Sequence, residues 1–322
     1  MNNILITSAG KRVSLVKAFK TEQKKYFPEG IIITVDANPQ LSAACHVADK
    51  FYKVPRLNDP DYINELISIC KLNDISLIIP TIDTELLLLS ENEPRLLAEG
   101  VIPVISSVDL VRICGDKRLT HNFFESHGVK TAREYLKTDY KLPLFIKPID
   151  GSRSIDTFII SKEEDFRDSY FEDKKLMFLE YLDHKVYEEY TCDLYYGKDF
   201  SLKCVVPRKR IEVRDGEVNK GKTEKNILVR YVKAHLNFIE GARGCLTVQF
   251  FKHKFENSII GIEINPRFGG GFPLSYFAGA NFPEWIIQEY MLNQPVEPFD
   301  DWEDNLLMLR YDNEILIHGF KD

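Results

Sequence analysis

The sequence has no excess of basic residues, no closely spaced cysteine pair and no long hydrophobic segment. Of its 322 residues, 42 are Lys or Arg and 49 are Asp or Glu, which gives a net charge of −7 at pH 7. Without a global basic field, attraction to nucleic acid or to an anionic membrane is disfavoured. We therefore expect no nucleic-acid partner and no membrane partner.

The six cysteines are scattered, form no Cys-x-x-Cys pair and lie mostly in apolar runs, which predicts reduced core residues. The chain enters an apolar strand at residues 4–6 without the pattern of a signal peptide, and no apolar run approaches membrane-spanning length. We therefore expect a cytoplasmic location. A content of 44% hydrophobic and 28% charged residues fits a globular protein of two or three domains.

The first third of the chain alternates short apolar strands with helical stretches: strands at 4–7, 31–35, 77–80 and 101–105, helices at 13–26, 60–72 and 86–97. This alternation predicts a parallel, Rossmann-like sheet, whose ligands would bind beyond the carboxyl ends of the strands. Candidates there are Ser8 to Arg12, Asp36, Thr81, Asp83 and Glu85, each equally consistent with a helix cap. The first loop has one glycine, Gly10, where a dinucleotide fingerprint needs three, so nicotinamide binding is disfavoured.

Two apolar runs near the other end of the chain, 246–251 and 259–264, flank a polar turn and predict a hairpin. Glu263 and Asn265 are two residues apart, so they share one face of the second strand, and Gln249 is expected opposite Glu263 on the same face. A carboxylate and two amide carbonyls on one surface suit a hard cation such as Mg²⁺. The alternative is an ordinary hairpin with a polar outer face.

The strand is expected to stop at Pro266, and the glycines at 269–271 predict a flexible backbone beside the metal. Between them, Arg267 has a planar cation suited to a bidentate contact with phosphate or carboxylate.

Two earlier segments carry lysines in positions that suit phosphate binding. Asp116 and Lys117 open a helix that closes at Gly128, and an apolar strand from Leu142 ends at Lys147. The loop at 150–154 offers backbone N–H groups and hydroxyls that could fold over anionic oxygens. Viewed alone, a lysine in a first helical turn is usually a solvated surface charge, and a loop of this kind is usually a surface hairpin tip.

Taken in order, these motifs resemble those of ATP-grasp enzymes, in particular one module of the large subunit of carbamoyl phosphate synthase, over about residues 113–300. The resemblance implies a mixed α/β and α+β fold. A Rossmann-like pre-ATP-grasp domain (1–112) would precede a two-subdomain ATP-grasp fold (113–303) with a smaller lid subdomain at about 127–195. Helices are expected at about 231–240 and 282–292, and a C-terminal hairpin within 304–322 would pack on the core.

The resemblance also implies roles for individual residues. ATP would contact Lys117, Lys147, Ser152, Ser154, Glu180, Tyr181, Leu182 and Glu189, with Glu188 an open alternative to Glu189 at the ribose. Gln249, Glu263 and Asn265 would hold Mg²⁺, for which Mn²⁺ could substitute. Catalytic roles fall to Arg267, Arg208 and Lys147, and Arg208, Arg210 and Arg230 are open alternatives for gripping an anionic substrate or the γ-phosphate.

The implied function is an ATP- and Mg²⁺-dependent ligase that activates a carboxylate as an acyl phosphate and joins it to an amine, releasing ADP. Its partners would be small-molecule carboxylate and amine substrates, and a homodimer is compatible with the sequence. Two alternatives are an ATP-binding regulatory or sensing protein without turnover and a kinase-like enzyme that releases the acyl phosphate.

Overall fold

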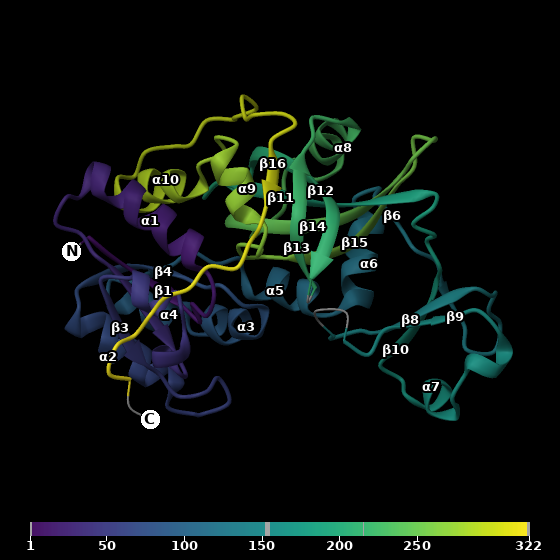
Figure 1. Ribbon diagram of the computed structural model, residues 1–322, viewed down its shortest axis with the longest axis horizontal. Coiled ribbons are helices and arrows are strands. Elements are labelled where there is room, and N and C mark those ends of the chain that lie inside the picture. Colours follow the sequence, from purple (N-terminus) through teal and green to yellow (C-terminus); the bar gives the residue numbers. More distant parts are fainter. Residues whose placement is uncertain (1, 152–154, 215, 321–322) are drawn as a thin grey trace.

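The computed structural model describes residues 2–151, 155–214 and 216–320, which form three sheets of five, four and seven strands (Figure 1). The five-stranded sheet comes first along the chain. The four-stranded sheet lies at the opposite end of the molecule, and the seven-stranded sheet lies between them (Figure 1).

The N-terminal sheet is parallel throughout, in the order β3-β2-β1-β4-β5. Helices cover it, so its central strands are continuous apolar runs rather than alternating ones; Ile4, Leu5 and Ile6 are fully buried. The predicted Rossmann-like sheet is confirmed. The elements are β1 (Asn3–Thr7), α1 (Val13–Tyr26), β2 (Ile32–Asp36), η1 (Pro39–Leu41), η2 (Cys45–Val47), β3 (Lys50–Lys53), α2 (Tyr62–Leu72), β4 (Ile75–Ile79), α3 (Asp83–Glu91), α4 (Glu93–Ala98) and β5 (Ile102–Pro103).

Two helices, α5 (Val108–Gly115) and α6 (Lys117–Ser126), connect this sheet to the rest of the chain. Asp116 caps α6, because its Oδ1 accepts hydrogen bonds from the backbone N–H groups of Arg118 at 2.8 Å and Leu119 at 3.3 Å. After the helix, Gly128 takes a φ of +73°, a value that glycine adopts without strain. The predicted helix start and stop are both present.

The small sheet is antiparallel, in the order β7-β10-β8-β9, and we call it the lid sheet. It has its own core of Leu144, Ile146, Ile160, Tyr170 and Phe178. Its elements are β7 (Glu134–Tyr135), β8 (Leu144–Pro148), β9 (Phe158–Ile160), η3 (Glu163–Asp165), α7 (Asp168–Glu172) and β10 (Leu176–Glu180).

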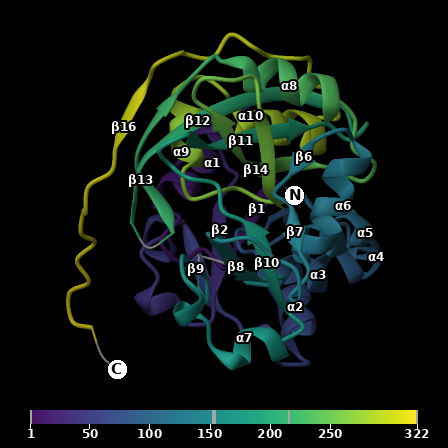
Figure 2. The same cartoon turned by 90° about the vertical axis from the view of Figure 1, so that its right-hand side faces the viewer.

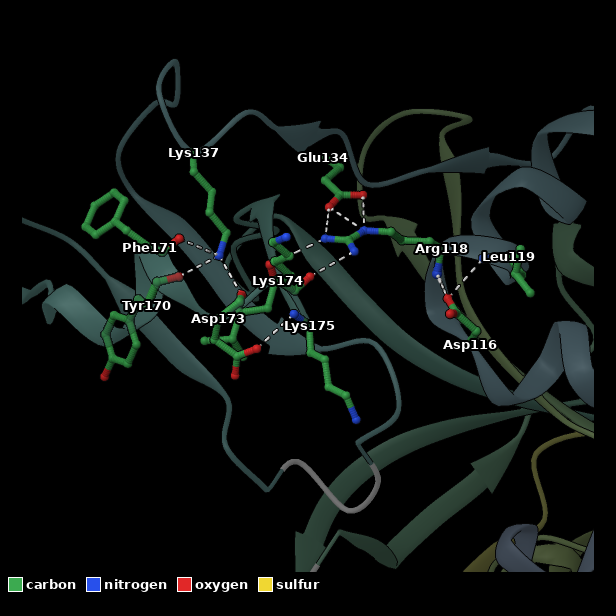
Figure 3. A network of polar contacts seen from close by, with 11 residues as sticks. Asp116, Arg118, Leu119, Glu134, Lys137, Tyr170, Phe171, Asp173, Lys174 and Lys175 are labelled. Carbon is green, nitrogen blue, oxygen red and sulfur yellow. Dashed lines mark hydrogen bonds and ion pairs between the residues drawn. The ribbon is translucent and has the colours of Figure 1, made fainter.

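Polar contacts tie the lid sheet to the first turn of α6 (Figure 3). Arg118 Nε donates to both carboxylate oxygens of Glu134, at 2.9 and 3.3 Å, and its Nη1 donates to Lys174 O at 3.1 Å. Further out, Lys137 Nζ lies among the carbonyl oxygens of Tyr170, Phe171 and Asp173. The lid sheet is therefore braced against the helix that carries Lys117.

The seven-stranded sheet runs in the order β16-β13-β12-β11-β14-β15-β6. One face packs on α6 and α8 through a core that includes Phe124, Leu228, Leu194, Val248 and Phe250. The elements are β6 (Lys130–Thr131), β11 (Tyr187–Tyr196), β12 (Leu202–Arg214), β13 (Glu217–Thr223), α8 (Ile227–His235), β14 (Gly244–His253), β15 (Ile259–Asn265), α9 (Phe272–Phe277), α10 (Phe282–Ile286), η4 (Ile287–Met291) and β16 (Leu307–Leu309).

The structure departs from the sequence-based expectation in three segments. Strand β11 pairs with β12 and β14 at the centre of the large sheet, so residues 187–195 lie there and not in the lid. Helix α8 begins at Ile227, earlier than the expected start near residue 231, and follows the hairpin β12–β13. In place of a C-terminal hairpin, β16 pairs with β13 alone, and among the described residues no strand follows it (Figure 2). Within the same residues, no helix combines the length and apolarity needed to cross a membrane.

Candidate nucleotide and metal site

The hairpin β14–β15 brings together the three oxygen-bearing side chains predicted to bind a metal. Gln249 pairs directly with Glu263 across the strands, as the period of two predicted. Gln249 Nε2 donates to Glu263 Oε1 at 2.6 Å, and Asn265 Nδ2 donates to the same oxygen at 3.0 Å. The three side chains therefore converge on one point of the exposed sheet face.

The donor set at this point fits a hard cation. It offers one carboxylate and two amides, and a half turn of either amide would exchange its N–H₂ for its carbonyl oxygen. In the described part of the chain no three His, Cys, Asp or Glu side chains are grouped to hold a metal by themselves. A cation at Glu263 would therefore take its remaining ligands from phosphate oxygens and water.

Two lysines approach this carboxylate from other elements. Lys147, on β8 of the lid sheet, is 7% exposed, and burial lowers its pKa to about 8 even though Glu263 raises it. Lys117, at the start of α6, also has a pKa lowered by burial and raised in part by Glu263. Its Nζ donates to Gly151 O and, at 3.5 Å, to Ile149 O. Two cations and one carboxylate thus share a partly desolvated space.

A histidine that the sequence analysis did not single out lies beside these lysines. His121, on α6, is 7% exposed. Burial and, to a smaller extent, the charges of Lys147 and Lys117 together lower its pKa to about 4, so the ring is neutral at pH 7. A lone histidine four residues after Lys117 belongs to no motif; only helical spacing places it on the same side of the helix.

The start of the loop after β8 is also described. Asp150 Oδ2 accepts from Lys175 Nζ at 2.7 Å, and this hydrogen bond lowers the pKa of Asp150. Ser152 and Ser154, expected to contact phosphate, lie outside the described residues.

Strand β11 separates the two neighbouring glutamates, because successive side chains point to opposite faces. Glu189 lies on the face of Gln249 and Glu263, where Arg210 Nη1 is 2.8 Å from its Oε1. Burial raises the pKa of Glu189, whereas Arg210 lowers it. Glu188 lies on the other face and pairs with Lys209 at 2.6 Å. Of the two, Glu189 is the one near the metal residues.

An apolar surface borders Glu189. Leu182 packs with Ala132 and Ile260, and Tyr187, Phe251 and Ile262 extend the cluster. Two residues before Leu182, the backbone N–H of Glu180 donates to Arg133 O at 2.8 Å. Tyr181, between Glu180 and Leu182 in the sequence, is half-buried. The connection from the lid sheet to the large sheet therefore contributes Leu182 to an apolar cluster next to the strand of Glu189.

The three alternative arginines occupy different places. Arg208 is 1% exposed and forms a bidentate pair with buried Asp193, at 2.7 and 2.9 Å. Its guanidinium therefore lies in the protein interior and not in the candidate site. Arg230 is exposed on α8, which covers the opposite face of the sheet. Only Arg210 reaches the site, where its Nη1 donates to Gln249 Oε1 at 3.2 Å.

The three glycines after β15 serve close packing and not the flexibility expected from the sequence. None has a positive φ. A Cβ on Gly269 would lie 3.0 Å from Thr247, on Gly270 2.7 Å from Glu217, and on Gly271 2.1 Å from Arg208. Just before them, Arg267 Nη2 pairs with Asp83 Oδ2 of the N-terminal domain at 2.6 Å.

The fold combines a parallel N-terminal domain, a small lid sheet and a large sheet whose face carries one carboxylate and two amides, and two lysines from β8 and α6 approach that carboxylate. Residues 4–105 match the family described as PylC-like, N-terminal domain. Residues 172–309 match the family described as ATP-grasp in the biosynthetic pathway with Ter operon. No curated protein sequence matches the chain.

Solved structures share the fold at low sequence identity. The biotin carboxylase domain of Hydrogenobacter thermophilus 2-oxoglutarate carboxylase, solved with MgADP, ADP and bicarbonate, superposes with a TM-score of 0.72 at 14% identity, over 95% of this chain and 73% of that one. An L-amino acid ligase from Bacillus licheniformis gives a TM-score of 0.68 at 13% identity, over 92% and 75%. Rhizobium etli pyruvate carboxylase gives 0.66 at 16% identity over 86% of this chain, which spans only 27% of that protein.

Residues 172–309 are therefore similar to an ATP-grasp family and residues 4–105 to a PylC-like N-terminal domain, and the solved structures above share the fold. The predicted superfamily and fold class are confirmed, whereas the likeness to carbamoyl phosphate synthase is loose.

Proposed function

We propose that this protein is an ATP- and Mg²⁺-dependent ligase that activates a carboxylate as an acyl phosphate and joins it to an amine, releasing ADP and phosphate. The observation that carries the proposal is the meeting of Lys147, Lys117 and Glu263, from three different elements, on the sheet that also contributes to an apolar cluster around Leu182 and Ile260. This combination suits a nucleoside triphosphate, whose base needs apolar contact and whose phosphates need cations.

In this proposal the chain's own residues hold and neutralise the nucleotide. The base packs on the cluster of Leu182, Ala132 and Ile260, and Glu189 accepts from the ribose hydroxyls. Lys117 and Lys147 contact the phosphates. Glu263, with the amide oxygens of Gln249 and Asn265, would hold Mg²⁺, or Mn²⁺ in its place, which would supply charge stabilisation for the transferring phosphoryl group.

The reaction needs no protein nucleophile. A carboxylate oxygen attacks the γ-phosphorus, and the bond from this phosphorus to the β-γ bridging oxygen breaks, leaving ADP. The amine then attacks the acyl carbon, phosphate leaves, and the amine loses a proton to form the amide. Positioning and charge stabilisation carry both steps. Arg210 and Arg267 are the arginines placed to bind anionic groups, whereas Arg208 orders the interior through Asp193.

Lys117 connects the nucleotide to the end of strand β8. Its Nζ donates to the carbonyl oxygens of Ile149 and Gly151. A phosphate would compete for the same ammonium group, so nucleotide binding would free these two carbonyl oxygens.

The proposal also includes a domain division. An N-terminal domain spans residues 1–112, an ATP-grasp domain spans residues 113–303 and contains a lid that ends near residue 180, and a C-terminal segment follows. We also propose a cytoplasmic location, with which six free cysteines agree. Oligomeric state is left to experiment.

The test is release of ADP from ATP and Mg²⁺ in the presence of pooled carboxylates and pooled amines. Release that requires both pools supports the ligase. Release with carboxylates alone, with the product trapped as a hydroxamate by hydroxylamine, assigns the kinase-like alternative. ATP binding without ADP release under any condition assigns the sensing alternative.

A further inference from the structure

A shallow pocket with strong positive charge lies where the N-terminal domain meets the large sheet. Its lining includes Lys11 and Arg12 after β1, Glu217 on β13, Gly270 after β15 and Arg310 after β16. None of these residues belongs to the nucleotide and metal set. The pocket thus joins four segments that are far apart in the sequence.

The positive charge of the pocket is incompletely neutralised. Three cations, Lys11, Arg12 and Arg310, share the single carboxylate of Glu217, at 3.5, 3.6 and 3.1 Å. Three positive charges against one negative leave an excess of two, in a chain whose net charge is −7. All three distances exceed the 2.7 to 2.9 Å typical of a strong charge-assisted hydrogen bond.

A fourth cation borders the same pocket. Arg267 pairs with Asp83 at 2.6 Å, yet within the described residues its buried Nε has no hydrogen-bond partner, and neither has Asp83 Oδ1. Burial lowers the pKa of Arg12, Glu217 raises it, and the nearby charges of Arg267 and Arg310 lower it again, as expected for cations that share one space. Arginines remain charged, so a partly desolvated cluster of them is costly without an anion.

The loop that carries Lys11 and Arg12 is held in place by the N-terminal domain. Its Ser8 and Gly10 both have a φ of +49°, and the Gly10 N–H donates to Asp36 Oδ2 at 3.1 Å. Ser8 Oγ donates to buried Glu85 Oε2 at 2.9 Å. Asp36 and Glu85, two candidates at the strand ends, therefore fix the loop that presents the cations.

We propose that this junction pocket binds an anionic group of the substrate, a carboxylate or a phosphate, distinct from the carboxylate that is phosphorylated. This inference rests on the proposed ligase function, because only a ligase of this kind would have such a substrate. It names a substrate class, namely molecules with at least two anionic groups. Arg267 lies two residues after Asn265, so the second group is held beside the site where the first one reacts.

The first experiment measures anion binding to the nucleotide-free protein by calorimetry and thermal shift. The probes are acetate, succinate and inorganic phosphate at constant ionic strength. We expect succinate or phosphate to bind at least tenfold more tightly than acetate, because a second charge engages a second cation. Tighter binding of succinate than of phosphate would indicate that the natural group is a carboxylate. Tighter binding of phosphate would indicate a phosphoryl group.

Two variants change the pocket charge in opposite directions. Arg310→Gln, at a side chain that is one-third exposed, should weaken binding of the preferred probe roughly tenfold, since a charged hydrogen bond is lost. Glu217→Gln raises the excess charge from two to three and should strengthen binding severalfold, although it removes three ion pairs. Arg112→Gln, which loses an exposed pair with Glu91, is the matched control and should leave binding unchanged.

Loss of affinity in both pocket variants, equal affinity in all variants, or no binding of any probe would overturn the proposal. Its failure is separable from failure of the ligase proposal. If anion affinity changes as expected in the two pocket variants but the protein never releases ADP, only the ligase proposal is rejected. If the protein releases ADP but its anion affinity is the same in both variants, only the pocket proposal is rejected.

Discussion

The buried lysine of the lid sheet allows a prediction in which stability and nucleotide binding move in opposite directions. Burial lowers the pKa of Lys147 from 10.5 to about 8, after the attraction of Glu263 has been included. The difference corresponds to about 3 kcal/mol of unfavourable free energy for the charged form in the folded protein. Lys147→Met keeps the shape of the chain and removes the charge. It should therefore stabilise the nucleotide-free protein at pH 7 by up to about 3 kcal/mol.

The sign of the pH dependence follows from proton binding. Below pH 8 the lysine is protonated in both the folded and the unfolded state, so the full cost is present. Between about pH 8 and 10.5 the unfolded state binds more protons, so the stability of the native sequence rises with pH and the cost disappears. The advantage of Lys147→Met should accordingly be largest at pH 7 and small near pH 10.

The assay is thermal or denaturant unfolding of both proteins from pH 7 to 10, with and without ATP and Mg²⁺. ATP should stabilise the native sequence and have little effect on Lys147→Met, and its affinity for the native sequence should fall as pH rises above 8. Lys130→Met, at an exposed lysine of β6, is the control and should show no pH-dependent difference. A destabilised Lys147→Met at pH 7, with a deficit that does not change with pH, would refute the reasoning.

Three further predictions concern the same face of the large sheet and the loop after it. Glu263→Gln should lower ADP release on the order of 10²-fold with little change in the unfolding midpoint, because an exposed-face carboxylate contributes to charge stabilisation more than to folding; unchanged turnover would remove it from the metal site. Glu189→Gln should raise the KM for ATP, whereas Glu188→Gln, on the opposite face, should not, and equal effects would argue against the ribose contact. Gly271→Ala should lower the unfolding midpoint because its Cβ would lie 2.1 Å from Nη1 of buried, ion-paired Arg208 and 2.5 Å from Val218 Cγ1, while Gly115→Ala, which has nothing within 4 Å, should be neutral.

Local periodicity was enough to predict the parts of the site that lie on one strand or one hairpin. The period of two placed Glu263 and Asn265 together and Gln249 opposite them, and the register agrees. Capping residues predicted the start of α6 at Asp116. The parallel N-terminal sheet followed from strict strand and helix alternation. The hairpin and the helix cap join residues close in the sequence, so the local pattern contains their geometry, whereas the long-range pairing of the parallel sheet is implied by the alternation of strands and helices.

What the sequence could not supply are contacts between distant segments. Arg208 is buried because Asp193, on the neighbouring strand, accepts its guanidinium, and nothing in a cation-rich stretch distinguishes it from exposed Arg230. The lid boundary was placed too late because the hydrophobic pattern of residues 187–195 does not reveal which sheet they join. The glycines at 269–271 have ordinary backbone angles, and only the neighbouring side chains show why they lack a Cβ.

The charge distribution explains how an acidic chain can present a site for a polyanion. At physiological ionic strength, interactions between exposed charges fade over about 8 Å, so the net charge of −7 has little effect inside a partly closed site. Local, buried charges are screened far less, and here they are the lysines at 117 and 147 and the arginines at 12 and 267. Burying these cations costs stability without an anion, and an anion that enters relieves the cost. Desolvation of these cations therefore destabilises the ligand-free protein and, on the proposed function, increases its affinity for phosphate and carboxylate. The cationic side chains would already be positioned and desolvated before the ligand binds.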